Sequence, residues 1–173
     1  MFRSRMISLV VGGVAGIALC LLAPAAASAA EGVDGFARDA AIGGMAEVEL
    51  GRLAVEKATN PGVKKFGQRM IDDHSKANED LRKAAREQGI GLPTQIDSRH
   101  KAQIDELSKL SGYAFDKAYM HDMVEDHEKD VAEFEKIVKE PGKTAVQDFA
   151  AKVLPTLEDH LKMARQVSQD LGQ

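Results

Sequence analysis

Apolar residues recur every three or four positions along most of the chain beyond residue 30, which is the spacing of amphipathic helices. Runs of this pattern predict helices over residues 34–59, 61–89, 98–110, 113–139 and from 144 to the C-terminal region. Segments containing glycine and proline separate the runs, as expected where helices end. Because aromatic residues make up only 5% of the chain and tryptophan is absent, an all-α fold is favoured over an all-β one.

Capping residues support these boundaries. Asp34, Asn60 and Asp97 are each suited to accept hydrogen bonds from the first free backbone amides of a helix, and Pro61 suits the first helical position. Thr144 starts a capping box with the glutamine three residues later. These signals define the starts of four of the five predicted helices.

The lengths of the connections predict how the helices are arranged. Two tight turns form two antiparallel hairpins, and a long connection over residues 89–112, which contains the short helix, joins them. This arrangement is the ferritin-like four-helix bundle with one long crossover. The alternative is an up-and-down bundle of five helices, which differs in how the 98–110 segment packs.

Residues 1–29 carry the three parts of a cleaved secretory signal peptide. Arg3 and Arg5 precede an apolar run over residues 6–23, and the small residues that follow allow cleavage between Ala29 and Ala30. The alternative is an uncleaved membrane anchor, because the apolar run is near the lower length limit for a membrane span. Cleavage leaves one mature domain, residues 30–173, that is periplasmic or secreted.

The position of the single cysteine argues against a lipoprotein, and the net charge argues against a nucleic-acid-binding protein. Cys20, the only cysteine, lies in the apolar run behind Leu19, whereas a lipoprotein signal needs a small residue at that position. The net charge of the chain is −4, and residues 1–30 contain two arginines and no acid, so the remainder carries 21 basic and 27 acidic residues. Because phosphate contacts need a basic surface, we expect no nucleic-acid partner. We also expect no membrane span in the mature chain.

A five-residue pattern of acid, Asp, His, any residue and Lys occurs three times, once in each of three predicted long helices. Its histidines are His74, His127 and His160. At about 100° per residue, each histidine is at the centre of an apolar face, whereas the Asp before it lies at the flank and the Lys lies near the solvent face. All three imidazoles are therefore predicted to point into the bundle.

On the first predicted helix, the matching face is lined mainly by small and apolar residues, with Glu47 at its middle. Counting from the adjacent turns puts Glu47, His74 and His127 at nearly one level of the bundle. His160 is out of step by about five residues, or about 7 Å along the helix axis. Glu49, on the opposite side of the first helix, is the second choice of carboxylate if that helix is rotated.

A carboxylate and three neutral imidazoles that meet in a bundle core can hold a divalent transition metal ion such as zinc, iron, manganese or copper. The alternative is that these groups and nearby Asp or Asn side chains satisfy one another in a structural hydrogen-bond network that can include trapped water, since unpaired burial of polar groups is costly. A ferritin-type di-metal site is not expected, because Ile71, Val124 and Leu157 stand where its Glu-x-x-His motif needs an acid.

Each of the three histidines also has a methionine within one helical turn, and these are Met70, Met123 and Met163. Thioether and imidazole ligands together suit Cu(I). Methionine also fills gaps in apolar cores, so these residues rank below the histidines as metal ligands. The sequence contains no motif for a catalytic nucleophile or a phosphate-binding loop.

Several segments spread over nearly the whole of residues 30–173 carry a family likeness, namely Glu47 to Ala54, Met70 to His74, Leu92-Pro93, Gly112 to Asp116, Tyr119, His127, and Leu154-Pro155 with His160. In these segments the chain resembles exported bacterial proteins that have a ferritin-like domain of unknown function and are often labelled outer membrane proteins. The resemblance implies a ferritin-like four-helix bundle, and it brings no established reaction.

Two functional hypotheses follow. In the first, the chain is a periplasmic ferritin-like protein that binds a transition metal through Glu47, His74, His127 and His160. In the second, it is a non-catalytic envelope or stress-related helical protein whose core histidines form a structural hydrogen-bond network. Removal of metal by a chelator distinguishes them, because only a bound ion couples to stability.

Overall fold

A computed structural model describes residues 24–172 of the chain, with side chains described over residues 31–172. These residues form five helices and no strand, which confirms the predicted all-helical fold. The helices are α1 (Pro24–Lys57), α2 (Pro61–Glu87), α3 (Ser98–Ser108), α4 (Gly112–Lys139) and α5 (Ala145–Asp170). Most of the predicted signal peptide, residues 1–29, lies outside the described residues.

The predicted caps of α2, α3 and α5 are confirmed. Asn60 accepts hydrogen bonds from two backbone amides of α2, and Asp97 accepts one from an amide of α3. Thr144 and Gln147 form the complete capping box of α5. These contacts satisfy backbone amides that have no partner within the helix, so each helix has a defined start.

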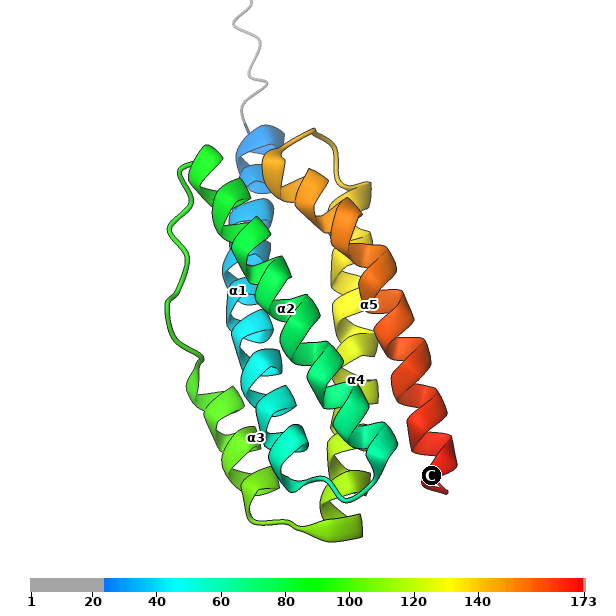
Figure 1. Ribbon diagram of the computed structural model, residues 1–173. Coiled ribbons are helices and arrows are strands. Elements are labelled where there is room, and N and C mark those ends of the chain that lie inside the picture. Colours follow the sequence, from blue (N-terminus) through cyan, green and yellow to red (C-terminus); the bar gives the residue numbers. More distant parts are fainter. Residues whose placement is uncertain (1–23, 173) are drawn as a thin grey trace, which may run out of the picture.

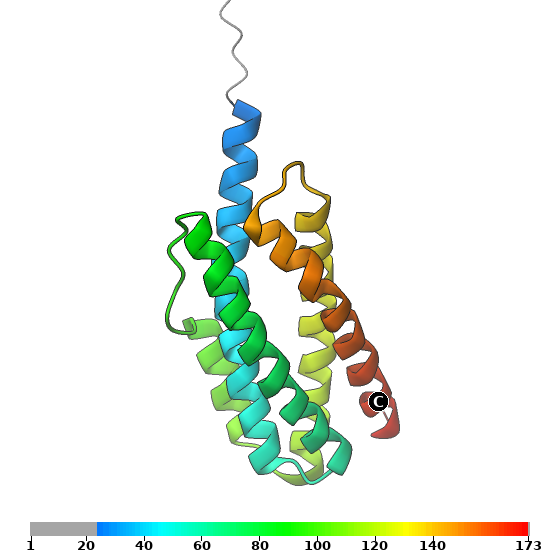
Figure 2. The same cartoon turned by 45° about the horizontal axis from the view of Figure 1, so that its top comes forward.

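The predicted cap at Asp34 is wrong, because α1 begins at Pro24 and runs through Asp34. The segment over residues 25–30 consists of alanines and one serine, and alanine has the highest helix propensity of all residues. Pro24 suits the first position of such a helix. As Figure 2 shows, the first turns of α1 extend beyond the ends of the other helices.

The helices form two hairpins that pack into one bundle (Figure 1). α1 and α2 are antiparallel neighbours, as are α4 and α5, and α2 packs against α5. The connection after α2 runs back along the outside of the bundle, so α2 and α4 point in the same direction. The short helix α3 packs against α1 and α4 at the side of the bundle, which is the crossover predicted from the sequence.

Two contacts fix how the helices meet. The carboxylate of Asp116 on α4 accepts hydrogen bonds from the Thr59 hydroxyl at 2.6 Å and the Asn60 amide at 2.9 Å, which ties α4 to the turn between α1 and α2. A Cβ atom added to Gly51 of α1 would lie 2.6 Å from the carbonyl oxygen of Gly67 on α2. Glycine is required at Gly51 because the two backbones approach so closely there.

The core consists of two apolar clusters separated by a polar layer. One cluster contains Phe36, Leu81, Phe134 and Phe149, and the other contains Leu50, Met70, Met123 and Ala164. On each long helix, one residue predicted to bind metal falls between the two clusters. These residues are Glu47 on α1, His74 on α2, His127 on α4 and His160 on α5.

Candidate metal centre

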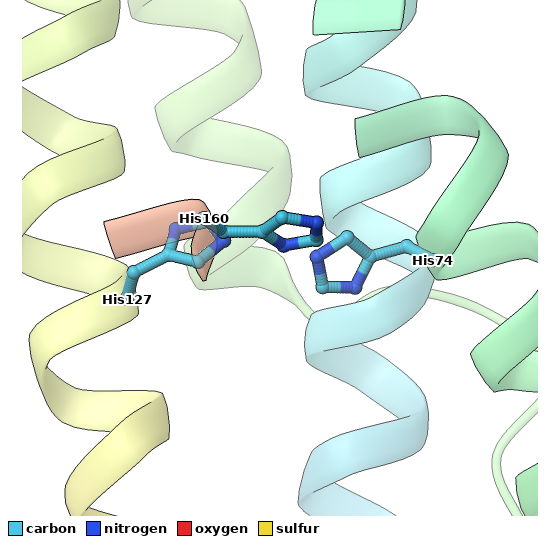
Figure 3. Close-up of side chains that lie close together, drawn as sticks. All are labelled: His74, His127 and His160. Carbon is cyan, nitrogen blue, oxygen red and sulfur yellow. The ribbon is translucent and has the colours of Figure 1, made fainter. Parts of the chain in front are cut away.

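Three imidazoles from three different helices meet in this polar layer. His74, His127 and His160 point toward one another (Figure 3), and their ring centroids are separated by 5.9 Å for His74 and His127 and by 5.4 Å for the other two pairs. One nitrogen atom of each ring lies within 4.8 Å of the other two. The predicted inward orientation of all three side chains is confirmed.

The axial displacement expected for His160 does not separate its ring from the other two. Its ring is as near to His74 as to His127, at 5.4 Å from each. The loop after α4 extends to Thr144, and α5 starts only at Ala145, so residues that simple counting assigns to the helix belong to the loop.

The environment keeps all three imidazoles neutral. Their exposed fractions are 6% for His74, 0% for His127 and 1% for His160. Burial lowers the pKa of His74 well below its usual value, and the neighbouring imidazoles add to the effect. Burial also lowers the pKa of His127 to about 4 and that of His160 by less, since Asp73 opposes the shift of His160. A neutral imidazole is the form that binds a metal.

Hydrogen bonds to two of the imidazoles fix their protonation. His127 donates through Nδ1 to the carbonyl oxygen of Met123 at 2.9 Å, and His160 donates through Nε2 to the carboxylate of Asp73 at 2.8 Å. Because both partners can only accept, the proton of each neutral ring is on that nitrogen. The lone pairs of His127 Nε2 and His160 Nδ1 are therefore free, and neither atom has a hydrogen-bond partner. The buried Nε2 of His74 has none either.

Asp73 contacts the polar layer, although the sequence reasoning placed it only at the flank of its helix. It joins α2 to α5 through His160, and it also accepts a hydrogen bond from Arg69. Burial alone would raise the pKa of the Asp73 carboxyl, but the hydrogen bonds from Arg69 and His160 outweigh it and lower the pKa. The corresponding residues of the other two repeats, Asp126 and Asp159, make no such bond to a core histidine, so the repeat alone could not single out Asp73.

Glu47 lies in the polar layer but outside the group of three mutually close imidazoles. It is 4% exposed, and its Oε2 has no hydrogen-bond partner. Burial raises the pKa of Glu47 well above its usual value, as do the nearby carboxylates of Asp130, Asp126 and Asp122 on α4. Its carboxyl group is therefore directed to the α4 side of the bundle. Glu49, the second choice, is exposed.

The methionines and the remaining histidines have other surroundings. Met70 and Met123 are fully buried in the apolar cluster next to the polar layer, and Met163 is partly buried against the same cluster. His121 is exposed on α4. His100 donates through Nδ1 to the carboxylate of the capping residue Asp97 at 2.7 Å.

The structural-network alternative is met in part, because His160 bonds to the carboxylate of Asp73 and His127 bonds to the carbonyl oxygen of Met123. Over the residues that the structure describes, no hydrogen bond joins two of the three imidazoles, and each ring has a buried nitrogen without a partner. One nitrogen atom of each ring also belongs to a group of close ligand atoms that could hold a metal ion.

The family profile of a domain of unknown function, DUF4142, matches residues 20–167. The chain belongs to the DUF4142 family. This membership confirms the predicted assignment to a family of unknown function. No curated protein matches the chain.

Two solved structures resemble this DUF4142 chain in fold. A DUF305 protein of Streptomyces coelicolor, described as a predicted secreted protein, matches with a TM-score of 0.67 at 16% identity, over 81% of this chain and 94% of its own. A DUF305 fragment from Deinococcus radiodurans matches with a TM-score of 0.68 at 14% identity, over 82% and 95%. Both likenesses concern the helical fold. Within residues 24–172, no helix is both long and apolar enough to cross a bilayer.

Proposed function

We propose that this DUF4142 protein binds one divalent transition metal ion through His74 Nε2, His127 Nε2 and His160 Nδ1. Two observations support the proposal: each ring has a buried nitrogen without a hydrogen-bond partner, and the three rings offer ligand atoms that lie within 4.8 Å of one another. A buried polar atom without a partner costs about 1–3 kcal/mol, so three at one point are a substantial cost unless a ligand satisfies them. A metal ion satisfies all three at once.

The chemistry of the ligands favours zinc or copper. Imidazole suits both metals, and three imidazoles leave a fourth coordination position for water or a small ligand, as in sites with three protein ligands. Asp73 supports His160 from behind, and such a carboxylate raises the basicity of the ligand and holds its ring in place. A site for one ion favours metal binding and buffering over storage of many ions.

We also propose that the protein is exported and that its bundle is ferritin-like. The first proposal is supported by the signal-peptide features of residues 1–29 and by the secreted description of the Streptomyces neighbour. The second is supported by two hairpins joined by a long crossover, which makes α2 and α4 parallel.

The proposal is tested by titrating the metal-free protein with Co²⁺, whose visible absorption reports the number and geometry of its ligands, and then displacing it with Zn²⁺. We expect one ion per chain, with the intense absorption of a four-coordinate site. Loss of a residue that supports a metal ligand lowers the metal affinity by roughly 10- to 100-fold. A larger loss is expected for each of the ligand variants His74→Gln, His127→Gln and His160→Gln.

The matched control is His121→Gln, which changes an exposed histidine on α4 and should leave the affinity unaltered. Circular dichroism of each variant without metal shows whether the bundle is intact. Wild-type protein that folds and binds neither Co²⁺, Zn²⁺ nor Cu²⁺ would overturn the proposal, as would binding that all three core variants retain.

A further inference from the structure

A cavity of about 320 Å³, which we call the acidic cavity, opens between α1, α3 and α4 beside the polar layer of the core. Six carboxylates line it, namely Asp39, Glu47, Asp97, Asp126, Asp130 and Glu133. Asp39 and Glu133 are exposed and place its mouth at the protein surface, whereas Glu47 is buried at its inner side.

A smaller cavity of about 50 Å³, which we call the inner cavity, continues the acidic cavity toward the histidines. The two cavities share Asp39, Gly43, Asp130 and Glu133 as lining residues. His74 lines the inner cavity, and it is the one candidate ligand of the three that does so. This volume is sufficient for an ion that keeps part of its water shell. The two cavities are therefore neighbours that lie between the surface and His74.

The carboxyl groups along this path are only partly paired with cations. Arg99, Lys129 and His100 also line the acidic cavity, but Lys129 lies 3.6 Å from Asp126 and His100 pairs with Asp97. Among the residues that the structure describes, no ion pair is formed by the other four carboxylates, which are Asp39, Glu47, Asp130 and Glu133.

Burial raises the pKa of Asp130 to about 7, and the nearby carboxylates of Asp126 and Glu133 add to the shift against the opposing charges of Arg99 and Lys129. The carboxyl groups therefore repel one another, and a cation between them would relieve the repulsion. The carboxylates do not form a compact ligand set, since the three histidines are the group of close ligand atoms in the described part of the chain. This arrangement suits passage of a cation better than its retention.

We propose that the acidic cavity is the entrance through which hydrated divalent cations reach the histidine centre, with Glu47 as its buried inner carboxylate. The inference rests on the proposed metal-binding function. Negative potential concentrates cations at the mouth, Glu47 has an unpartnered buried oxygen to replace lost water, and His74 is the first ligand that an ion meets.

Gly43 allows a direct test, because it lines both cavities and an added Cβ atom would have no heavy atom within 4 Å. Gly43→Leu should fill the passage without a clash that unfolds α1. Gly35→Leu is the matched control, since Gly35 also lies on α1 with open space at its Cβ but lines neither cavity.

The measurement is stopped-flow uptake of Co²⁺ by the metal-free full chain, with release measured by chelator competition. We expect Gly43→Leu to slow uptake and release together by about tenfold or more, with an equilibrium Kd within about twofold of wild type. The double variant Asp130→Asn with Glu133→Gln should slow uptake and weaken its dependence on ionic strength. Gly35→Leu should behave as wild type.

Glu47→Gln separates passage from ligation. As an entrance residue, Glu47 should alter the rates and leave Kd unchanged, whereas a change in Kd would make it a fourth ligand and overturn its assignment here. Unaltered rates in the Gly43 and charge variants, with wild-type Kd, would overturn the entrance while leaving the histidine centre intact. Absence of Co²⁺ binding in the wild type would instead contradict the metal-binding function itself.

Discussion

The pH dependence of zinc affinity reports the protonation of the three histidines in the folded protein, because imidazole binds metal only when neutral. Three independent imidazoles with an ordinary pKa of about 6.5 would lose roughly 50-fold in apparent affinity between pH 7.5 and pH 6.0. The loss is large because each ring is about three-quarters protonated at the lower pH.

The structure predicts a much smaller loss. Burial lowers the pKa of His74 well below its usual value and that of His127 to about 4, so both rings remain neutral at pH 6.0. The pKa of His160 is also lowered, although its hydrogen bond to Asp73 opposes the shift. Even if His160 titrated at its ordinary value, it would weaken binding by only about fourfold.

Competition between the protein and a chromophoric chelator at pH 7.5 and 6.0 measures this difference once the protonation of the chelator is taken into account. Calorimetry in buffers of different ionisation enthalpy gives a second readout, with fewer than one proton released per zinc at pH 6.0. A loss of about 50-fold, with about two protons released, would refute the reasoning that burial holds the imidazoles neutral.

Three further predictions follow from individual contacts. Asp73→Asn should weaken zinc binding by about 10- to 100-fold by titration, whereas Asp72→Asn, at an exposed neighbour, should not. The folded pKa of His127 is depressed, so its contribution to stability is full above the unfolded pKa of about 6.5 and is lost as pH falls toward 4. Between pH 7.5 and pH 5, the free energy of urea unfolding of the metal-free wild type should fall by about 2 kcal/mol more than that of His127→Gln. Comparing the two proteins removes the contribution of buried carboxyl groups, which is the same in both. Equal losses in the two proteins would contradict the prediction. Gly51→Ala should destabilise the fold by about 1–3 kcal/mol because the added methyl group clashes with α2, whereas Gly43→Ala should stabilise it by up to about 1 kcal/mol. Equal melting temperatures for the two variants would count against the close contact between α1 and α2.

Helical periodicity was sufficient to predict that the three histidines point inward, because a residue at the centre of an apolar face must point into a bundle. Counting from the turns put His74 and His127 at nearly one level but left His160 about five residues out of step. The close approach of His160 to both other rings therefore did not follow from the count. Local capping signals were equally informative at Asn60 and Thr144, because a cap depends on residues close in sequence.

Periodicity could not predict which neighbour each polar residue would face. Glu47 is in the middle of the inner face of α1, yet its carboxyl group is surrounded by acids of α4 and lies outside the group of imidazoles. Asp73 contacts His160 across two helices, and that contact depends on the packing of α2 against α5. The sequence supplies the position of a side chain around its own helix, whereas these contacts depend on the rotation and offset of two helices.

The most direct test of the histidine centre is the metal content of the protein isolated from the cells that produce it, without chelator or affinity tag. Elemental analysis should be made beside a variant that combines His74→Gln, His127→Gln and His160→Gln, with His121→Gln as control. The account predicts close to one transition metal ion per chain in wild type and control, and none in the triple variant. A wild-type protein that contains no metal and gains no thermal stability from added zinc or copper would contradict it.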